Sequence, residues 1–332
     1  MAFDAVLLLS FGGPEGPDEV MPFLHNVVRG RLVSADRLQQ VADHYLEFGG
    51  VSPINAQNRA LRDALIDALA ARSSPLPVYW GNRNWNPLLV DTIRAMGADG
   101  VVRAAAFVTS AYSSYSGCRQ YLDDIEAARA AVGPSSPEIV KLRPFFNHPG
   151  FVGPLADGLR AARKQAGPEA PIFLTAHSIP AAMAATCSYE QELKETARLV
   201  TSQAGEADSA WSLAFQSRSG APGQAWLGPD INDALVALPD STPAAIVTPI
   251  GFVSDHMEVV YDLDRQAAAT ASERGLELVR SATPGCHPDF VRMICQLVDE
   301  ADQSDSIALT LGDLGPAPCP CRPGCCPGPA RR

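Results

Sequence analysis

The sequence of 332 residues lacks long hydrophobic runs and has few basic residues. Nothing in it approaches the roughly 18 consecutive apolar residues of a membrane-spanning helix. The apolar start at residues 5–9 follows Asp4, with no cleavage site after it. We therefore expect no signal peptide, no integral membrane segment and a cytoplasmic protein. The net charge of −11 argues against nucleic acid as a partner, because phosphate neutralisation needs a basic face.

Phosphate-binding motifs are also missing. The sequence contains neither GxGxxG nor GxxxxGKS/T, the glycine-rich loops that hold nucleotide phosphates in many α/β proteins. The composition is that of a well-packed globule, with 46% hydrophobic and 19% charged residues. A chain of this length exceeds the usual size of a single hydrophobic core, so two domains of similar size are expected.

Apolar runs alternate with helical patterns along the chain, and the alternation restarts near residue 149. The runs at 5–9, 171–174 and 244–247 are continuously apolar, as expected of parallel strands covered on both faces. We therefore predict an α/β fold with two similar domains, each a parallel sheet flanked by helices, and an active-site cleft between them. The predicted boundaries are 1–148 and 149–308, followed by a tail at 309–332 rich in Cys, Pro and Gly.

Two loops that follow predicted strands carry side chains suited to chemistry. Segment 174–180 reads LTAHSIP and presents His177, and segment 249–258 reads PIGFVSDHME and presents Glu258. Ligands bind at the carboxyl ends of strands in open α/β sheets, so we expect one site shared between the two loops.

Segment 249–258 also predicts the start of a helix, capped by Ser254 or Asp255. On that helix Glu258, Asp262 and Gln266 would lie on one face, since residues four apart are neighbours. Such a row could conduct protons or a divalent cation. The alternative is that Asp255 and Glu258 form only a capping box that suits the helix dipole.

Two further groups of residues could contact a ligand. Arg29 and Arg31 flank a turn glycine and could fork onto ligand carboxylates, although basic residues past a helix end also suit its dipole. The loop 110–121 holds Tyr112, Tyr115 and Tyr121 among small hydroxyl residues. These tyrosines could form a floor under a flat aromatic ligand, or they could cap an ordinary core.

Half of the eight cysteines lie close together in the tail, where 319–326 reads CPCRPGCC. In a cytosolic chain this density favours metal binding over disulfides. A structural zinc site and a disordered tail are the alternatives. The scattered cysteines, expected as small core residues, are Cys118, Cys187, Cys286 and Cys295.

Several motifs together resemble the ferrochelatase family. They are LLSFGGP at 8–14, GGVSP at 49–53, TAHSIP at 175–180, FQSR at 215–218, WLGPD at 226–230 and PIGFVSDHME at 249–258. The resemblance covers nearly the whole globular chain. It implies two Rossmann-like chelatase domains that clasp a porphyrin, and insertion of Fe²⁺ as the last or next-to-last step of haem synthesis.

The resemblance also implies roles for residues near the metal. His177 would take the pyrrole protons near neutral pH, because the ordinary pKa of histidine is about 6.5. Glu258, expected on the opposite side of the flat ring from His177, would bind or hand over Fe²⁺ with it. Asp262 would continue the line outward as a relay for protons or metal, whereas Gln266 stands where the family often has another acid.

Other residues match the family's porphyrin contacts, namely Arg29, Arg31, His44, Ser52 and Tyr121. His44 stands where an arginine is often found. Phe11 stands where some relatives place a tyrosine able to ligate iron from the far face of the ring, and a phenylalanine side chain has no atom that can ligate iron.

The amino-acid sequences of these motifs most resemble those of Gram-positive relatives that use coproporphyrin III rather than protoporphyrin IX. The implied partners are coproporphyrin III and Fe²⁺, with a possible hand-off to downstream haem-synthesis enzymes. The rivals are a protoporphyrin IX ferrochelatase, a cobalt chelatase of the same superfamily, which should lack WLGPD, and a non-catalytic haem or porphyrin carrier.

The resemblance extends to the tail, since some ferrochelatases carry a 2Fe-2S cluster there and thiolates are its usual ligands. Adjacent cysteines are awkward as joint ligands, so Cys118 would complete the set while one tail cysteine stays free. The tail candidates are Cys319, Cys321, Cys325 and Cys326. The cluster would be structural or sensory, because metal insertion transfers no electrons.

Overall fold

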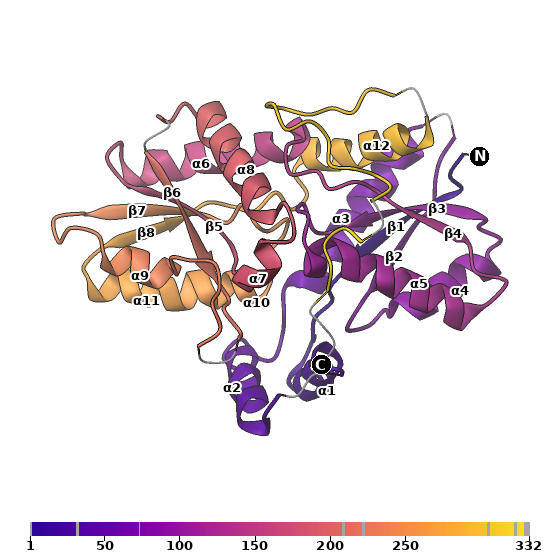
Figure 1. Cartoon of the computed structure of the whole chain (residues 1–332), viewed down its shortest axis with the longest axis horizontal. Coiled ribbons are helices and arrows are strands. Elements are labelled where there is room, and N and C mark those ends of the chain that lie inside the picture. Colours follow the sequence, from indigo (N-terminus) through magenta and orange to yellow (C-terminus); the bar gives the residue numbers. More distant parts are fainter. Residues whose placement is uncertain are drawn as a thin grey trace.

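The computed structural model describes residues 2–30, 33–72, 74–207, 210–220, 223–303, 306–321 and 324–328. The chain forms two halves that lie side by side (Figure 1). Each half contains a four-stranded sheet within these residues, and the paired strands run parallel.

The first half alternates strands with helices and contains one short π-helical turn, η1. The strands are β1 (Ala5–Ser10), β2 (Val78–Asn82), β3 (Arg103–Val108) and β4 (Glu138–Lys141). The helical segments are α1 (Pro17–Val27), α2 (Ala35–Leu46), α3 (Ile54–Ala70), α4 (Leu89–Ala98), η1 (Tyr115–Arg119) and α5 (Gln120–Val132). Strand β1 is buried along its whole length, as its apolar sequence predicts for a central strand.

The second half repeats the pattern. Its strands are β5 (Ile172–His177), β6 (Trp211–Gln216), β7 (Ala244–Thr248) and β8 (Glu277–Arg280). Its helical segments are α6 (Pro149–Ala166), α7 (Ala181–Ala184), α8 (Tyr189–Ala204), α9 (Ile231–Val236), α10 (Met257–Val260), η2 (Asp262–Ala267), α11 (Ala268–Glu273) and α12 (Pro288–Asp302).

The two sheets have the same strand order. The first is β2-β1-β3-β4 and the second is β6-β5-β7-β8, so β5 to β8 occupy the places of β1 to β4. This repetition confirms the predicted fold of two similar α/β units. The order also places β5 and β7 in the interior of the second sheet, directly hydrogen-bonded to each other. The loops that leave these two strands therefore start next to each other.

One hydrophobic core joins the halves. Phe107 and Phe145 of the first half stack with ring centroids 5.1 Å apart, and Phe145 meets Phe151 of α6 at 5.3 Å. Phe290 of α12 packs against Phe145 at 6.0 Å. Helix α12 follows the second sheet in the chain but packs on α3 of the first half as well as on α6, as Figure 1 shows along the upper edge. The shared core holds the halves at one relative position.

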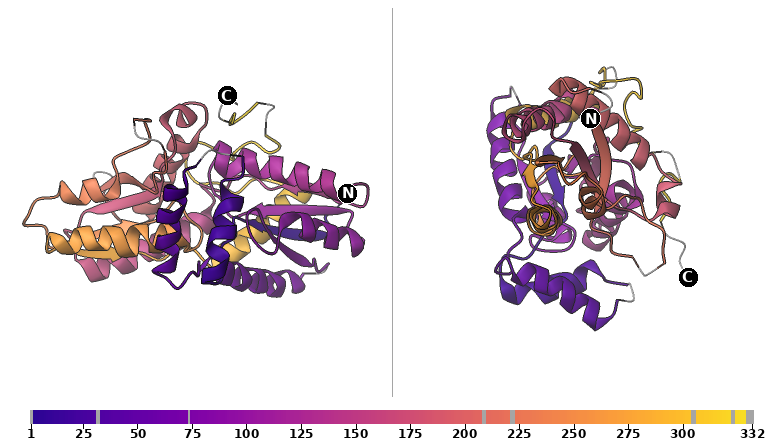
Figure 2. Two further views of the ribbon diagram at one scale, coloured as in Figure 1. Left: turned by 90° about the horizontal axis from the view of Figure 1, so that it is seen from below. Right: turned by 90° about the vertical axis from the view of Figure 1, so that its left-hand side faces the viewer.

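A second contact between the halves lies on the opposite side of the molecule. Helices α1 and α2 project together from the first half near the junction (Figures 1 and 2). From α2, His44 stacks on Tyr261 of the second half with ring centroids 3.9 Å apart. Glu47, next to the end of α2, pairs with Arg265 at 3.5 Å. Helix α2 thus reaches the segment that carries Glu258.

No helix among the described residues is long and apolar enough to cross a membrane.

Candidate active site

The structure brings His177 and Glu258 together at the carboxyl ends of β5 and β7. His177 is the last residue of β5, and Glu258 is the second residue of α10, in the segment that follows β7. His177 Nε2 lies 3.3 Å from Glu258 Oε1. Their side chains keep 31% and 47% exposure, so water and a ligand can reach the pair.

Backbone and side-chain hydrogen bonds fix the position of the pair. Tyr189 donates its hydroxyl to the His177 carbonyl at 2.9 Å, and the Ser178 carbonyl contacts His177 Nδ1. Gln216, beside His177 on the neighbouring strand, donates to the Glu258 carbonyl. With Nδ1 engaged by a backbone carbonyl, Nε2 is the ring nitrogen that faces Glu258.

The pair is charged at neutral pH. Burial lowers the pKa of His177, but the charge and hydrogen bond of Glu258, helped by the Ser178 carbonyl, outweigh it and raise the pKa to about 9. Burial likewise raises the pKa of Glu258, and His177 outweighs it to give a value of about 2. The sequence-based prediction used the ordinary histidine pKa, whereas here the imidazole already holds its proton at neutral pH.

Asp262 is the second acid near the pair. Burial raises its pKa to about 7, the Ser217 hydroxyl that donates to it opposes this, and the charge of Glu258 raises it further. Ser217 holds this position with a φ of 64°, a left-handed backbone that residues other than glycine seldom adopt. Asp262 can therefore exchange a proton close to neutral pH.

The predicted helix start and the predicted row of polar residues are wrong in detail. The cap of α10 is His256, whose Nδ1 accepts the Glu258 N–H at 3.2 Å, not Ser254 or Asp255. Helix α10 ends at Val260 and the π-helical η2 follows, so Gln266 does not continue an α-helical face. A π turn closes its hydrogen bonds over one residue more than an α-helix does. The angle between successive side chains therefore differs from that of an α-helix.

Asp255 does structural work instead of capping. Its carboxylate pairs with Arg280 at 3.1 Å and accepts from the Thr283 hydroxyl at 3.0 Å. Its N–H donates to Gln57 of the first half at 2.9 Å. The Tyr112 hydroxyl, also from the first half, donates to the Ile250 carbonyl at 2.9 Å. The segment that leads to Glu258 is thus held from both halves.

The predicted porphyrin-binding residues are scattered around the junction. Arg29 lies exposed beyond the end of α1, where it donates to Asn26 Oδ1 at 2.6 Å. His44 is stacked on Tyr261. Arg31 lies outside the described residues. The structure gives no contact from any described member of this set to His177 or Glu258.

Ser52 and Tyr121 are buried. Ser52 lies so close to Gly13 that a Cβ there would come within 2.7 Å of the Ser52 Cβ. Tyr121 belongs to the core under the first sheet, and the Arg83 guanidinium lies 4.5 Å from its ring centroid. Tyr112 is buried as well.

Arg83 and Tyr45 were not identified from the sequence. Arg83 follows the last residue of β2, pairs with Asp124 and lies 5.9 Å from the Phe11 ring centroid. Its place at a strand end was a signal that could have been used. Tyr45 of α2 has its pKa raised by burial and then by the charges of Glu258 and Asp262. That proximity depends on the docking of α2 and has no sequence signal.

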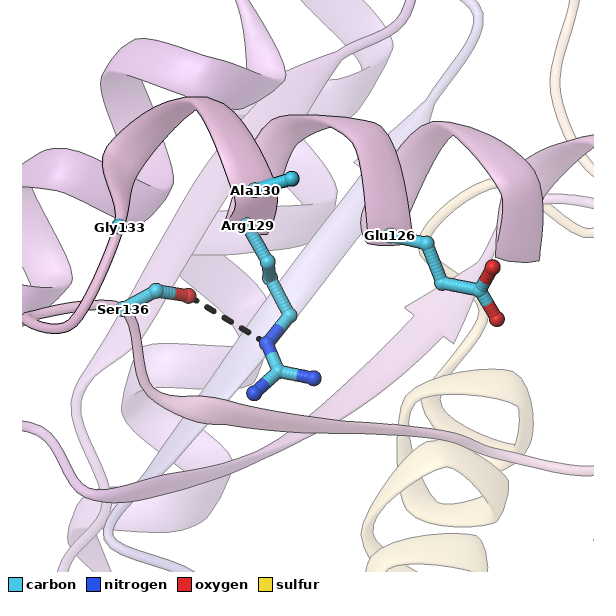
Figure 3. Close-up of a pocket in the computed structure, with 5 residues that line it drawn as sticks. All are labelled: Glu126, Arg129, Ala130, Gly133 and Ser136. Carbon is cyan, nitrogen blue, oxygen red and sulfur yellow. Dashed lines mark hydrogen bonds between the residues drawn. The ribbon is translucent and has the colours of Figure 1, made fainter.

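Two hollows in the surface lie away from these residues. One of about 320 Å³ is lined by residues of α5 and of the turn before β4 (Figure 3). Because Ser136 in its lining precedes β4, this hollow is at the amino end of the first sheet, whereas His177 ends β5. The other, of about 660 Å³, lies over α8 and β6. Neither hollow is lined by His177 or Glu258.

The tail returns to the first half and reaches Cys118 of η1. Arg143 donates to the Leu309 carbonyl at 3.0 Å, and Asn147 donates to the Gly315 carbonyl at 2.8 Å. Beyond these anchors, Cys321 Sγ lies 3.9 Å from Cys118 Sγ. Within the described residues no group of three or more His, Cys, Asp or Glu side chains is already arranged to hold a metal ion.

The pairing of His177 with Glu258 can be tested by titration. In Glu258→Gln the pKa of His177 is expected to fall well below its value of about 9, because burial then acts without the charge of the neighbouring carboxylate. NMR titration of the His177 ring measures this value, and Glu190→Gln, which removes a surface carboxylate paired with Lys194, is the matched control. An unchanged His177 pKa in Glu258→Gln would contradict the assignment.

Comparisons with known proteins identify the family. The sequence model of the ferrochelatase family matches residues 3–302. A protein of Rhodopirellula baltica named ferrochelatase is 50% identical, over 98% of this chain and 93% of its own length. A coproporphyrin III ferrochelatase of Mycolicibacterium smegmatis is 51% identical over 90% of each chain, and one of Streptomyces coelicolor is 48% identical over 99% of this chain and 95% of its own.

Solved structures show the same fold at low identity. SirB from Bacillus subtilis with Fe³⁺ superposes with a TM-score of 0.54 and 12% identity, over 90% of this chain and 95% of SirB. At this identity the likeness concerns the fold alone. The match to the family model over nearly the whole globular chain, with relatives at about half identity, shows that this chain belongs to the ferrochelatase family.

Proposed function

We propose that this chain inserts Fe²⁺ into coproporphyrin III to form Fe-coproporphyrin III in haem biosynthesis. The observation that carries the proposal is the His177–Glu258 contact of 3.3 Å at two adjacent strand ends, in a family member that is 51% identical to a protein named coproporphyrin III ferrochelatase. In this proposal the macrocycle lies between the halves, with its centre against that pair.

The reaction exchanges protons for a metal ion. A free-base porphyrin has two pyrrole N–H protons, and both must leave as Fe²⁺ binds the ring nitrogens. A histidine and a carboxylate side by side can bind a divalent metal through nitrogen and oxygen and can accept protons. His177 and Glu258 are therefore proposed to receive Fe²⁺ and to take up the pyrrole protons.

The raised pKa of His177 adds a condition to this scheme. Because the imidazole is protonated at neutral pH, it has to lose that proton before it can accept one from a pyrrole. An approaching dication weakens the hold of Glu258 on the imidazolium, since it competes for the same carboxylate and repels the positive ring. Asp262, with a pKa of about 7, is the nearby acid proposed to carry the proton outward.

The porphyrin carboxylates need donors on the first half. Arg29, Arg31, His44, Ser52 and Tyr121 are proposed from the family match. We add Arg83 because its guanidinium lies 4.5 Å from the Tyr121 ring centroid and 5.9 Å from that of Phe11. His44 would have to leave Tyr261 to contact the substrate. Coproporphyrin carries four carboxylates, which suits several basic and hydroxyl groups around one site.

Insertion into protoporphyrin IX is the nearest alternative, because one relative is named only ferrochelatase. A cobalt chelatase is disfavoured by the WLGPD motif, in which Asp230 caps α9 and Trp226 pairs with Pro180 beside His177. A non-catalytic haem or porphyrin carrier would gain nothing from Glu258.

We propose that the site is formed jointly by the domains 1–148 and 149–308, and that the protein works in the cytoplasm. All eight cysteines are free of disulfides, as is usual in a reducing compartment. The product has to leave before a second porphyrin binds. We propose that it passes to a later enzyme of haem synthesis.

The cysteine-rich tail is proposed to hold a 2Fe-2S cluster with Cys118. The Cys118–Cys321 contact supports the proposal, and the other tail thiols lie close enough to influence one another's pKa. Burial raises the pKa of Cys326 to about 12, with Cys325 and Cys118 adding to the rise. Burial also raises the pKa of Cys319, to which Cys118 contributes. The thiols thus lie within electrostatic range of one another, and a bound cluster would fasten the tail to the first half.

An anaerobic assay with Fe²⁺ and either porphyrin tests the catalytic proposal. His177→Ala and Glu258→Ala are each expected to lower kcat by about 100-fold or more, the usual contribution of a general acid or base. Coproporphyrin III is expected to react faster than protoporphyrin IX, and Glu190→Gln serves as the surface control. If both variants insert iron at the parent rate, the catalytic assignment is wrong.

Metal analysis tests the tail. Protein purified without oxygen is expected to hold about two iron and two sulfide per chain, the content of one 2Fe-2S cluster, with the visible absorption of that cluster. Cys118→Ser and Cys321→Ser should lose both, whereas Cys286→Ser, far from the tail in sequence, should keep them. If the parent protein contains zinc and no sulfide, the tail holds a structural zinc ion and the cluster proposal is wrong.

A further inference from the structure

Arg280 contacts two carboxylates at once. It is the last residue of β8, the edge strand of the second sheet, and its side chain is 21% exposed. Nε and one terminal nitrogen donate to the two oxygens of Asp264 at 2.5 and 3.0 Å. The terminal nitrogens also donate to the two oxygens of Asp255 at 3.3 and 3.1 Å. The planar guanidinium thus forks onto both acids, which a single ammonium could not do.

The two acids lie on either side of Glu258 in the chain. Asp255 precedes α10, which carries Glu258, and Asp264 lies in η2, which follows α10. Helix α10 is a single turn of four residues, and so short a helix is not stable without tertiary contacts. Arg280 supplies such contacts, because it joins the two ends of the segment 255–264.

Other contacts hold parts of this segment. Val259 and Leu263 are buried in the core of the second half and anchor its middle. The ion pair of Arg265 with Glu47 lies just beyond its end, and both partners are exposed, so this pair contributes little to stability. Arg280, in contrast, is less exposed and contacts both ends.

Loss of the guanidinium would leave two acids facing each other. Asp255 and Asp264 lie 3.1 and 2.5 Å from the same side chain, and like charges at such short range repel each other. The repulsion would drive the ends of the segment apart. Glu258, which lies between them, would then lose the support that keeps it 3.3 Å from His177 Nε2.

We propose that Arg280 is a positioning residue for iron insertion, because holding the two acids together keeps Glu258 against His177. The inference rests on the proposed function for its effect on the rate, but not for its effect on the structure. Among the described residues Arg280 forms no hydrogen bond or ion pair with His177 or Glu258 itself, so it acts through the two acids. The proposed donors to the porphyrin carboxylates lie on the first half, so porphyrin binding should not depend on Arg280.

Steady-state kinetics of Arg280→Met test this role, with Arg274→Met as the matched control. Arg274 is 24% exposed and pairs at 2.7 Å with Asp240, which lies before the start of β7 rather than after its end. Arg280→Met is expected to lower kcat about tenfold or more, since a small misplacement of a reacting group costs that much. The KM for coproporphyrin III should change less than about twofold, and Arg274→Met should keep both parental values.

Hydrogen exchange tests the structural part without substrate. In Arg280→Met the amides of segment 255–264 are expected to exchange about tenfold faster than in the parent, and Arg274→Met should match the parent. Asp264→Asn removes one arm of the fork and leaves the Asp255 pair, so it should speed exchange less and keep the fold. The double variant Arg280→Met/Asp264→Asn should lose no more kcat than Arg280→Met alone, because both changes remove the same contact.

The outcomes separate this inference from the proposal on which it rests. Parental exchange of segment 255–264 in Arg280→Met overturns the positioning role, as does a parental kcat or a double variant whose loss is the product of the two single losses. If Arg280→Met does not fold, parental exchange in Asp264→Asn overturns it instead. If the parent inserts iron into neither porphyrin, the proposed function is wrong, and the exchange experiment still decides whether Arg280 holds the segment.

Discussion

The structure depends on one electrostatic contact, between the imidazolium of His177 and the carboxylate of Glu258. It forms because β5 and β7 are hydrogen-bonded neighbours whose loops leave the same edge of the sheet. The first half then holds the Glu258 segment through Gln57 and Tyr112. An imidazole and a carboxylate are thereby kept 3.3 Å apart where solvent reaches them. A movement of one half relative to the other would displace the segment that carries Glu258. The shared core, which fixes the halves, therefore helps to keep the His177–Glu258 contact in place.

The same contact explains why proton and metal have to be considered together. An isolated histidine would release its proton near pH 6.5, whereas this one keeps it to about 9 because Glu258 stabilises the charged form. A dication that binds Glu258 removes that stabilisation. In the proposed function, binding of the metal thus makes the neutral imidazole of His177 available as a base, and only the proton has to move.

The fold and the central pair were predictable from sequence, and the reasons are physical. Continuous apolar runs such as β1 and β7 mark strands covered on both faces, and their repetition along the chain predicted two like sheets. His177 ends β5, and Glu258 lies in the segment that follows β7. The prediction that they lie on opposite sides of a flat ring was wrong, because the two side chains are in contact at 3.3 Å. Sequence patterns do not indicate where a short helix begins or whether it forms α or π turns. The cap at His256 and the π turn of η2 were therefore not predicted. Ser52 and Tyr121 are buried. Their burial could not be predicted, because family motifs do not report burial.

The central claim is that the macrocycle is held with its centre against His177 and Glu258, between the two halves. A crystal structure of the protein with metal-free coproporphyrin III bound tests this most directly. The account predicts the ring at the junction of the halves, with the His177 imidazole facing the pyrrole nitrogens and Glu258 beside it. A ring bound in another part of the molecule, with both side chains remote from its nitrogens, would contradict the account.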